Sequence, residues 1–342
     1  MQVNIRKINK AAGKTGSARR RKITALLLVL AITMLTLATA CASDKNSEKI
    51  PDDETTRTTG QPGTVTAPSG TNPATSSGST KSELVVVTSV YPLYLAAAQV
   101  ARGVNGVSVR NLTENITGCL HDYQLTTANM KTLERADAFI INGAGLEDYL
   151  ETIARDLPDL QIIEAAEGIA LTDENPHVWV SISLMMQQVE NITREMIELD
   201  PANREGFVKN AEDYLARLDT LRREMHVSID PLAQRKIITV HEAFPYFASE
   251  FNLEIAGVIE REPDSEPSAA EMAATIDLIK AQKVSAVFAE PQYPKATAEL
   301  IAKEAGARFY TLDPVASGDL NNLDGYLEAM ERNRLVLIEA LK

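Results

Sequence analysis

Short apolar runs alternate with helical patterns along residues 83–342, and this alternation limits the fold more than any other feature. The runs are "LVVVTSV" (84–90), "VSVRNL" (107–112), "DAFIING" (137–143), "LQIIEA" (160–165), "RKIITV" (235–240), "LEIAGVI" (253–259), "VSAVFAE" (284–290) and "ARFYTL" (307–312). Continuous apolar runs suit strands covered on both faces, and strands alternating with helices predict parallel, doubly wound sheets. Because about 260 residues exceed one small core, we expect an α/β fold of two lobes.

A long helical pattern, "DPANREGFVKNAEDYLARLDTLRREMHVSID" (200–230), lies between the two sets of strands. Asp200 suits the N-cap and Pro201 the first helical position. At 1.5 Å per residue the helix would be roughly 40 Å long. We therefore expect an N-terminal lobe over 83–199, a stiff linking helix over 200–230 and a C-terminal lobe over 231–342.

The first forty residues have the composition of an export signal. They contain no Asp or Glu, and the basic run Arg19–Lys22 precedes the apolar stretch "ITALLLVLAITMLTLA". An apolar body of about fifteen residues followed by small residues indicates a cleaved signal, with a short anchor helix as the alternative. The sequence "LATAC", which ends at Cys41, resembles a bacterial lipobox. This resemblance implies lipidation of Cys41 and anchoring of the chain outside the cytoplasm.

Residues 41–82 contain mainly Ser, Thr, Gly, Pro, Asp and Lys, and such a segment buries too little apolar surface to fold. We expect a disordered tether spanning roughly 35 Å. Eight of the 34 Lys and Arg lie in residues 1–40, so 26 basic and 47 acidic side chains remain, a net charge of about −21. Because phosphate binding needs a basic face, we expect no nucleic-acid partner. We also expect a monomer.

The four histidines of the chain are distributed unevenly over the predicted fold. His241 follows "IITV", His121 lies in the loop after "VSVRNL", and His177 lies in "ENPHVW" after "LQIIEA". Asp313 follows "FYTL" at another strand end, whereas His226 lies on the linking helix, where we expect surface exposure. In open α/β sheets ligands bind at the carboxyl ends of the strands. We therefore predict a site that combines three imidazoles with one carboxylate.

Three neutral imidazoles and a carboxylate suit Zn²⁺, with Mn²⁺ as the alternative. Such a set leaves no obvious open coordination position, which favours holding a metal over using it as a Lewis acid. We therefore expect no enzymatic activity. Cys119, two residues before His121, lacks a predicted base and is expected to be a small packed residue.

Residues 84–342 resemble the metal-binding lipoproteins of bacterial ABC importers for zinc and manganese, the group with a rigid linking helix. The motifs that carry the resemblance are "VVTSVYPLYLAAAQVARG", "HDYQLTTANMKTLERADAFIINGAGLEDYL", "NPHVWVSISLMMQQVENI", "VHEAFPYFASEFNLEIAGVI", "EPSAAEMAATIDLIKAQKVSAVFAEPQ" and "TLDPV". The resemblance implies four metal ligands, which fall on His121, His177, His241 and Asp313. It also implies two partners, a membrane permease and its cytoplasmic ATPase. The chain has no Walker A pattern, so energy must come from a partner.

The chain departs from the family pattern at some positions. Leu120 stands where Pro commonly precedes the first histidine, and the long His-rich loop of some zinc members is absent. The third ligand is His241, where manganese-type members often have Glu. Because imidazole favours the softer ion, this difference favours Zn²⁺ over Mn²⁺.

Three carboxylates near the predicted ligands could accept the second ring N–H of a histidine and fix its tautomer: Asp122, Glu242 and Glu290. Simple solvent exposure is the alternative for each of them. The acidic loop 260–268 is either a permease-docking segment or a solvated loop with a helix N-cap at Ser268. Trp179, two residues after His177, is expected in the core.

Three other classes of function remain open. An exported zinc-dependent hydrolase would need an open metal position and a general base, and the His-Glu-x-x-His helix is absent. For an adhesin-type surface lipoprotein, the ligands at strand ends would be coincidental. A receptor for a chelated metal or siderophore would use basic or aromatic contacts.

Overall fold

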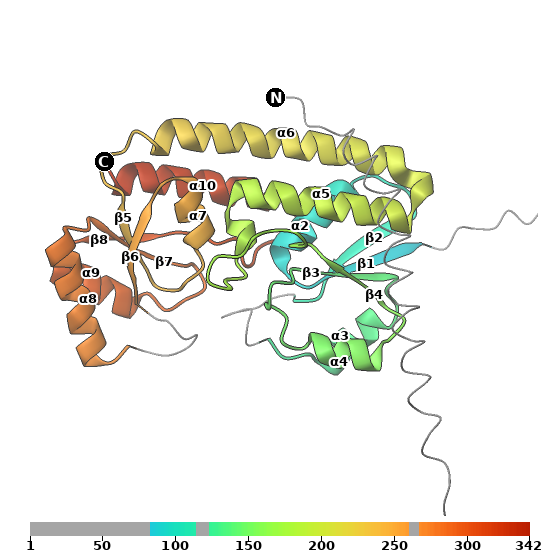
Figure 1. Ribbon diagram of the computed structural model, residues 1–342, viewed down its shortest axis with the longest axis horizontal. Coiled ribbons are helices and arrows are strands. Elements are labelled where there is room, and N and C mark those ends of the chain that lie inside the picture. The colour runs from blue at the N-terminus through green and yellow to red at the C-terminus, as the bar shows by residue number, and fades with distance from the viewer. Residues whose placement is uncertain (1–82, 114–122, 260–266) are drawn as a thin grey trace, which may run out of the picture. The chain divides into compact units, whose positions relative to one another are not determined.

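The computed structural model describes residues 83–113, 123–259 and 267–342, which contain two separate four-stranded sheets (Figure 1). All eight predicted strands are present, each within two residues of its expected limits. Neighbouring strands are parallel throughout both sheets. The predicted α/β fold with two doubly wound, parallel-sheet lobes is therefore confirmed.

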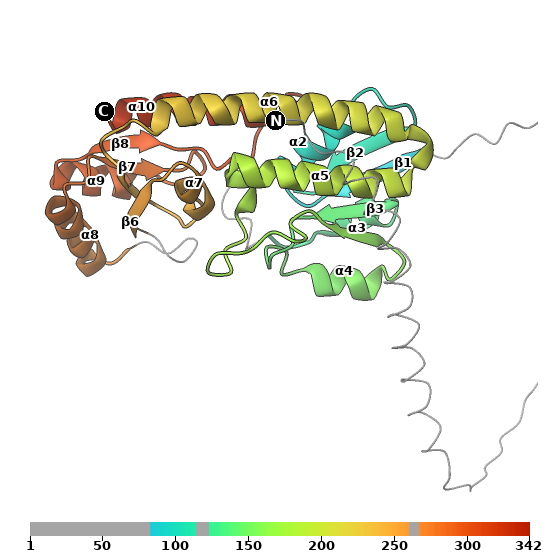
Figure 2. The same cartoon turned by 45° about the horizontal axis from the view of Figure 1, so that its top comes forward.

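The first sheet has the strand order β2-β1-β3-β4 and carries helices on both faces. Its strands and short helices are β1 Leu84–Thr88, α2 Tyr91–Val100, β2 Val107–Asn111, α3 Thr127–Leu133, β3 Ala138–Ile141, α4 Leu150–Asp156 and β4 Gln161–Glu164. Val86 and Ile140 pack in the cluster that includes α2, whereas Val87 and Phe139 pack with residues of α3 and α4. Figure 2 shows α3 and α4 on the side of the sheet away from α2. Burial on both faces explains why the central strands β1 and β3 are continuously apolar.

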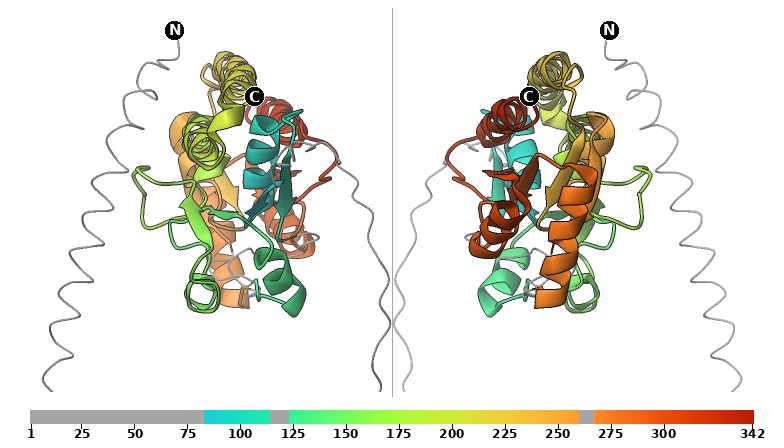
Figure 3. Two further views of the ribbon diagram at one scale, coloured as in Figure 1. Left: turned by 90° about the vertical axis from the view of Figure 1, so that its right-hand side faces the viewer. Right: turned by 90° about the vertical axis from the view of Figure 1, so that its left-hand side faces the viewer.

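The second sheet repeats this arrangement with the order β6-β5-β7-β8. Its elements are β5 Lys236–Thr239, α7 Pro245–Glu250, β6 Glu254–Val258, α8 Ala269–Gln282, β7 Ala286–Ala289, α9 Ala296–Ala305 and β8 Arg308–Thr311. Helices α8 and α9 lie side by side (Figure 3). The expected cap of α8 is confirmed, since Ser268 Oγ accepts from the Glu271 N–H and Glu271 Oε2 accepts from the Ser268 N–H.

Three long helices complete the fold: α5 Ile182–Leu199, α6 Arg204–Ile229 and α10 Gly325–Ala340. Helix α6, the predicted link, packs beside α5, α10 and α2 (Figure 1). The predicted cap at Asp200 is wrong for this helix, because Pro201–Asn203 form a 3-10 turn and α6 begins at Arg204. No helix in the described ranges combines the length and apolar character needed to cross a membrane.

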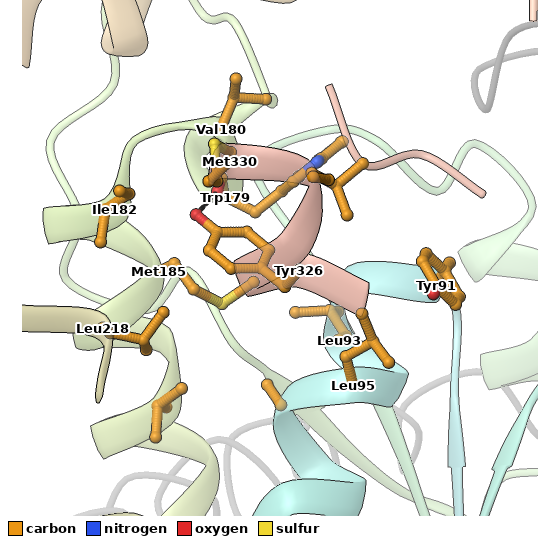
Figure 4. Packing of buried hydrophobic residues seen from close by; sticks show 14 of the residues in the cluster. Tyr91, Leu93, Leu95, Trp179, Val180, Ile182, Met185, Leu218, Tyr326 and Met330 are labelled. Atoms are coloured by element: carbon orange, nitrogen blue, oxygen red, sulfur yellow. Dashed lines mark hydrogen bonds between the residues drawn. The ribbon is translucent and has the colours of Figure 1, made fainter. Parts of the chain in front are cut away.

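The main hydrophobic cluster contains residues from both lobes. Tyr326 of α10 lies beside Met185 of α5, and Leu93 and Leu95 of α2 lie nearby (Figure 4). Trp179 is fully buried in this cluster, which confirms its predicted place in the core, and its carbonyl accepts a hydrogen bond from Tyr326 Oη at 2.8 Å. The two sheets are thus held by a shared core and not by the linking helix alone.

Candidate metal centre

Two of the predicted ligands, His177 and His241, lie next to each other although they belong to different lobes. His177 ends the loop after β4, directly before the 3-10 helix Val178–Val180, and His241 follows β5. Both are buried, and their ring centroids lie 5.0 Å apart with the planes at 83°. The carboxyl ends of the two sheets therefore bring two imidazoles together from positions 64 residues apart.

The surroundings of His177 fix its backbone and its ring. Asn175 Oδ1 accepts a hydrogen bond from the His177 N–H at 3.0 Å and lies 3.0 Å from Nδ1 of the same residue. The ring centroids of Trp179 and His177 lie 5.3 Å apart, with the planes at 54°. Pro176 is held as well, since its carbonyl accepts from Asn142 Nδ2 at 2.9 Å. The loop thus presents a single, well-defined orientation of the imidazole.

His241 contacts a buried carboxylate. Glu290, which follows β7 and is 2% exposed, places Oε1 3.2 Å from His241 Nδ1. Burial raises the pKa of the Glu290 carboxyl; the hydrogen bond and the charge of His241 lower it, and the nearby charge of Asp313 raises it further. The ring of Tyr293 lies 5.6 Å from the imidazole. Glu290 is therefore placed to accept a hydrogen bond from His241 Nδ1, the ring nitrogen that would face away from a bound metal.

Asp313 follows β8 and has a side chain that is 21% exposed. Asn333 holds its backbone, with Oδ1 accepting from the Asp313 N–H at 2.9 Å and Nδ2 donating to the Asp313 carbonyl at 2.7 Å. Asp313 Oδ1 accepts from the Val315 N–H at 2.8 Å, and Arg332 lies 3.6 Å from Oδ2. Burial raises the pKa of the Asp313 carboxyl, and the Val315 N–H and Arg332 oppose that rise.

Several predicted residues lie outside the described residues: Cys41, Cys119, His121, Asp122 and positions 260–266 of the acidic loop. Glu242 is described, and its side chain is exposed while its carbonyl accepts from Asn175 Nδ2 at 2.7 Å. His226 lies partly exposed on α6 with Nδ1 3.1 Å from Asp230. Within the described ranges, no group of three or more His, Cys, Asp or Glu side chains is arranged to hold a metal ion. The four-ligand set therefore stays a prediction.

Sequence reasoning missed Asn175, whose Oδ1 lies within hydrogen-bond distance of both the backbone N–H and the ring Nδ1 of His177. The signal was in the sequence, because an Asn directly before Pro176 combines a short amide side chain with a turn-forming position. It also missed Asn142, which holds the same loop from β3.

The chain matches a family profile described as "Zinc-uptake complex component A periplasmic" over residues 86–340. The chain belongs to this family. The resemblance to metal-binding lipoproteins of ABC importers is thereby confirmed, and the match covers both sheets and α6.

Several known proteins are similar to this chain over about three quarters of its length. The high-affinity zinc uptake system protein ZnuA of Bacillus subtilis is 26% identical over 76% of this chain and 87% of its own. The SBP FpvC of Pseudomonas aeruginosa, solved with Ni²⁺, is 31% identical over 76% of this chain and 97% of its own, with a TM-score of 0.69. FpvC has also been solved with Mn²⁺.

A third similar structure is the laminin binding protein Lmb of Streptococcus agalactiae, described as a bifunctional protein with adhesin and metal transporting activity. It is 27% identical over 76% of this chain and 100% of its own, with a TM-score of 0.66. FpvC and Lmb are thus similar to this chain in fold, while their descriptions give Ni²⁺ or Mn²⁺ for FpvC and two activities for Lmb.

Proposed function

We propose that this chain is the solute-binding protein of an ABC importer and that it captures Zn²⁺, with Mn²⁺ as the alternative ion, between its two lobes. The observation that carries the proposal is the pairing of His177 with His241 at 5.0 Å, one from each lobe, in a zinc-uptake family member. Asp313 and His121 would complete the set of ligands. Imidazole-rich sets favour Zn²⁺ among the abundant divalent ions.

The same contacts favour capture over catalysis. His241 and Glu290 form a buried pair, so this carboxylate is already occupied in orienting the ring and is poorly placed to activate a water molecule. We therefore propose that the chain is not an enzyme. No contact among the described residues supports the alternative of a zinc-dependent hydrolase. From Lmb we carry over metal transport but not the adhesin activity.

The partners in this proposal are a membrane permease and a cytoplasmic ATPase, and the chain would act outside the cytoplasm, anchored by lipid on Cys41. Replacing Cys41 with Ala should move the protein from the membrane fraction to the soluble exported fraction. A deletion strain should grow poorly when zinc is chelated and recover with the wild-type gene. Recovery with a His177→Ala, His241→Ala double variant would contradict the transport proposal.

Metal binding can be tested directly on the purified protein. After metal removal, Zn²⁺ and Mn²⁺ are titrated while the melting temperature and the emission of Trp179 are followed. A ligand present at a hundredfold excess over its dissociation constant should stabilise the protein by about 2.7 kcal/mol. If neither ion raises the melting temperature, the proposal is wrong.

Single variants then test the ligands. His121→Ala, His177→Ala, His241→Ala and Asp313→Ala should each weaken Zn²⁺ binding strongly. The matched control is His226→Ala, because His226 lies on α6 and pairs with Asp230. Affinity should also fall as the pH drops through the histidine range, since a protonated imidazole cannot bind the metal.

A further inference from the structure

Asn175 contacts residues on both sides of the candidate metal centre. Its Oδ1 faces His177, and its Nδ2 donates to the carbonyl of Glu242, the residue after His241. We propose that Asn175 is a positioning residue that sets the tautomer of His177 and ties the His177 loop to the turn that carries His241. This inference rests on the proposed function, because it assigns a supporting role at the same site.

Two backbone partners fix the orientation of the Asn175 amide. The His177 backbone N–H can only donate, so the atom 3.0 Å from it must be the oxygen. The Glu242 carbonyl can only accept, so the atom 2.7 Å from it must be the nitrogen. A flipped amide would oppose donor to donor and acceptor to acceptor. These two hydrogen bonds therefore distinguish the side-chain oxygen of Asn175 from its side-chain nitrogen.

The fixed amide determines the tautomer of His177. Asn175 Oδ1 accepts only, and it lies 3.0 Å from His177 Nδ1, so this nitrogen carries the proton. A neutral imidazole carries one N–H, which places the lone pair on Nε2, the ring nitrogen that would bind a metal. The carboxylates predicted from the sequence for this task are thus replaced at His177 by an amide.

The same residue joins the lobes at the site. Besides the Glu242 bond, the Asn175 carbonyl accepts from Tyr246 Oη of α7 at 2.6 Å, and Tyr246 Oη accepts from the Thr172 N–H at 3.0 Å. The loop from Thr172 to His177 is therefore bound to the turn after β5 at Glu242 and to α7 at Tyr246. Because Asn175 and Glu242 are close neighbours of the two histidines, their hydrogen bond limits how far the imidazoles can separate.

The experiment compares Asn175→Ala and Asn175→Asp with Asn210→Ala. Asn210 is the matched control, since it is also half-buried and its Nδ2 donates to two carbonyls, those of Val100 and Arg102, away from the site. Imidazole ¹⁵N NMR of the metal-free protein reports the tautomer, and competition with a chelator reports Zn²⁺ affinity. Loss of one supporting residue of a metal ligand typically costs about 10- to 100-fold in affinity.

We expect Asn175→Ala to lose the single Nδ1–H tautomer of His177 and to bind Zn²⁺ about 10- to 100-fold more weakly. Asn175→Asp should keep that tautomer, because a carboxylate accepts from both N–H groups, and should recover part of the affinity. Asn210→Ala should change neither quantity. The Asp variant also tests the tautomer if the Ala variant fails to fold.

An unchanged tautomer in Asn175→Ala, a lost tautomer in Asn175→Asp, or an affinity loss no larger than that of Asn210→Ala would overturn the inference. Failure of the wild-type protein to bind Zn²⁺ would instead overturn the proposed function. The two failures are distinguishable, because the tautomer is measured without metal.

Discussion

The indole N–H of Trp179 donates a hydrogen bond of 2.8 Å to the carbonyl of Pro314. Trp179 comes two residues after His177 and Pro314 comes directly after Asp313, so one buried bond joins the segments that carry two predicted ligands from different lobes. Tyr326 completes the arrangement by donating from Oη to the Trp179 carbonyl (Figure 4). The spacing of the lobes at the site is therefore set by core packing.

Replacing Trp179 with Phe should destabilise the protein by about 2 to 4 kcal/mol, because it leaves a cavity and an unpaired Pro314 carbonyl. Tyr326→Phe removes one hydroxyl only and should cost about 1 kcal/mol. Urea unfolding followed by far-UV circular dichroism measures the free energy of unfolding of both variants. Tryptophan emission does not serve here, because Trp179→Phe removes the only tryptophan. If both variants lose the same unfolding free energy, the indole of Trp179 does not stabilise the core more than the hydroxyl of Tyr326.

A second prediction concerns the start of α10. A Cβ added at Gly325 would lie 2.5 Å from Tyr91 Oη but 3.6 Å from Tyr91 Cζ. Gly325→Ala should therefore destabilise the protein by about 1 to 3 kcal/mol through overpacking. Adding Tyr91→Phe should relieve most of this cost, because it removes the clashing oxygen.

The control for this cycle is Gly318→Ala. A Cβ there would lie 2.6 Å from Cζ and 2.8 Å from Cε1 of Tyr91, so removing the hydroxyl leaves the clash in place. Tyr91→Phe should not rescue it. If Tyr91→Phe rescues both Ala variants equally in thermal unfolding, the clash with the Tyr91 hydroxyl does not explain why Gly325→Ala is destabilised.

The buried carboxyl of Glu147 should make stability depend on pH. Burial raises its pKa, and hydrogen bonds from Ser89 Oγ at 2.7 Å and from the Asn142 and Gly143 N–H groups oppose that rise. Since the folded state holds this proton more tightly than the unfolded chain, the contribution is complete below the ordinary Glu pKa. It is lost as the pH rises through the raised native value.

Relative to Glu147→Gln, the wild type should therefore lose unfolding free energy as the pH rises above the ordinary Glu pKa of about 4.3 and through the raised native pKa. Urea unfolding of the metal-free proteins at several pH values measures this difference. The control is Glu151→Gln, an exposed carboxylate of α4. Parallel pH curves for wild type and Glu147→Gln would refute the prediction.

The carboxylate of Glu290 should support metal binding through His241. Glu290→Ala removes the partner of His241 Nδ1 and should weaken Zn²⁺ binding about 10- to 100-fold. Glu242→Ala is the matched control, because its side chain is exposed and only its backbone carbonyl takes part in the site. Chelator competition on both variants measures the effect, and equal affinities would exclude a supporting role for Glu290.

The sequence by itself determined the local elements of this protein. The apolar runs that predict β1 to β8 and the helical pattern that predicts α6 are local features of the sequence. Each element buries its own apolar face in an α/β fold, whichever neighbours cover that face. The placement of His241 and Asp313 just after β5 and β8 followed from the same runs. Even so, the start of α6 was misplaced, because Pro201–Asn203 adopt a tighter turn.

Only the tertiary structure decided which distant residues meet. Trp179 and Pro314 are 135 positions apart, Asn175 and Glu242 are 67 apart, and His241 and Glu290 are 49 apart. A hydrophobic pattern specifies which face of an element is buried but not which loop of another lobe it meets. That pairing depends on how the shared core packs around Tyr326, and no local sequence signal carries it.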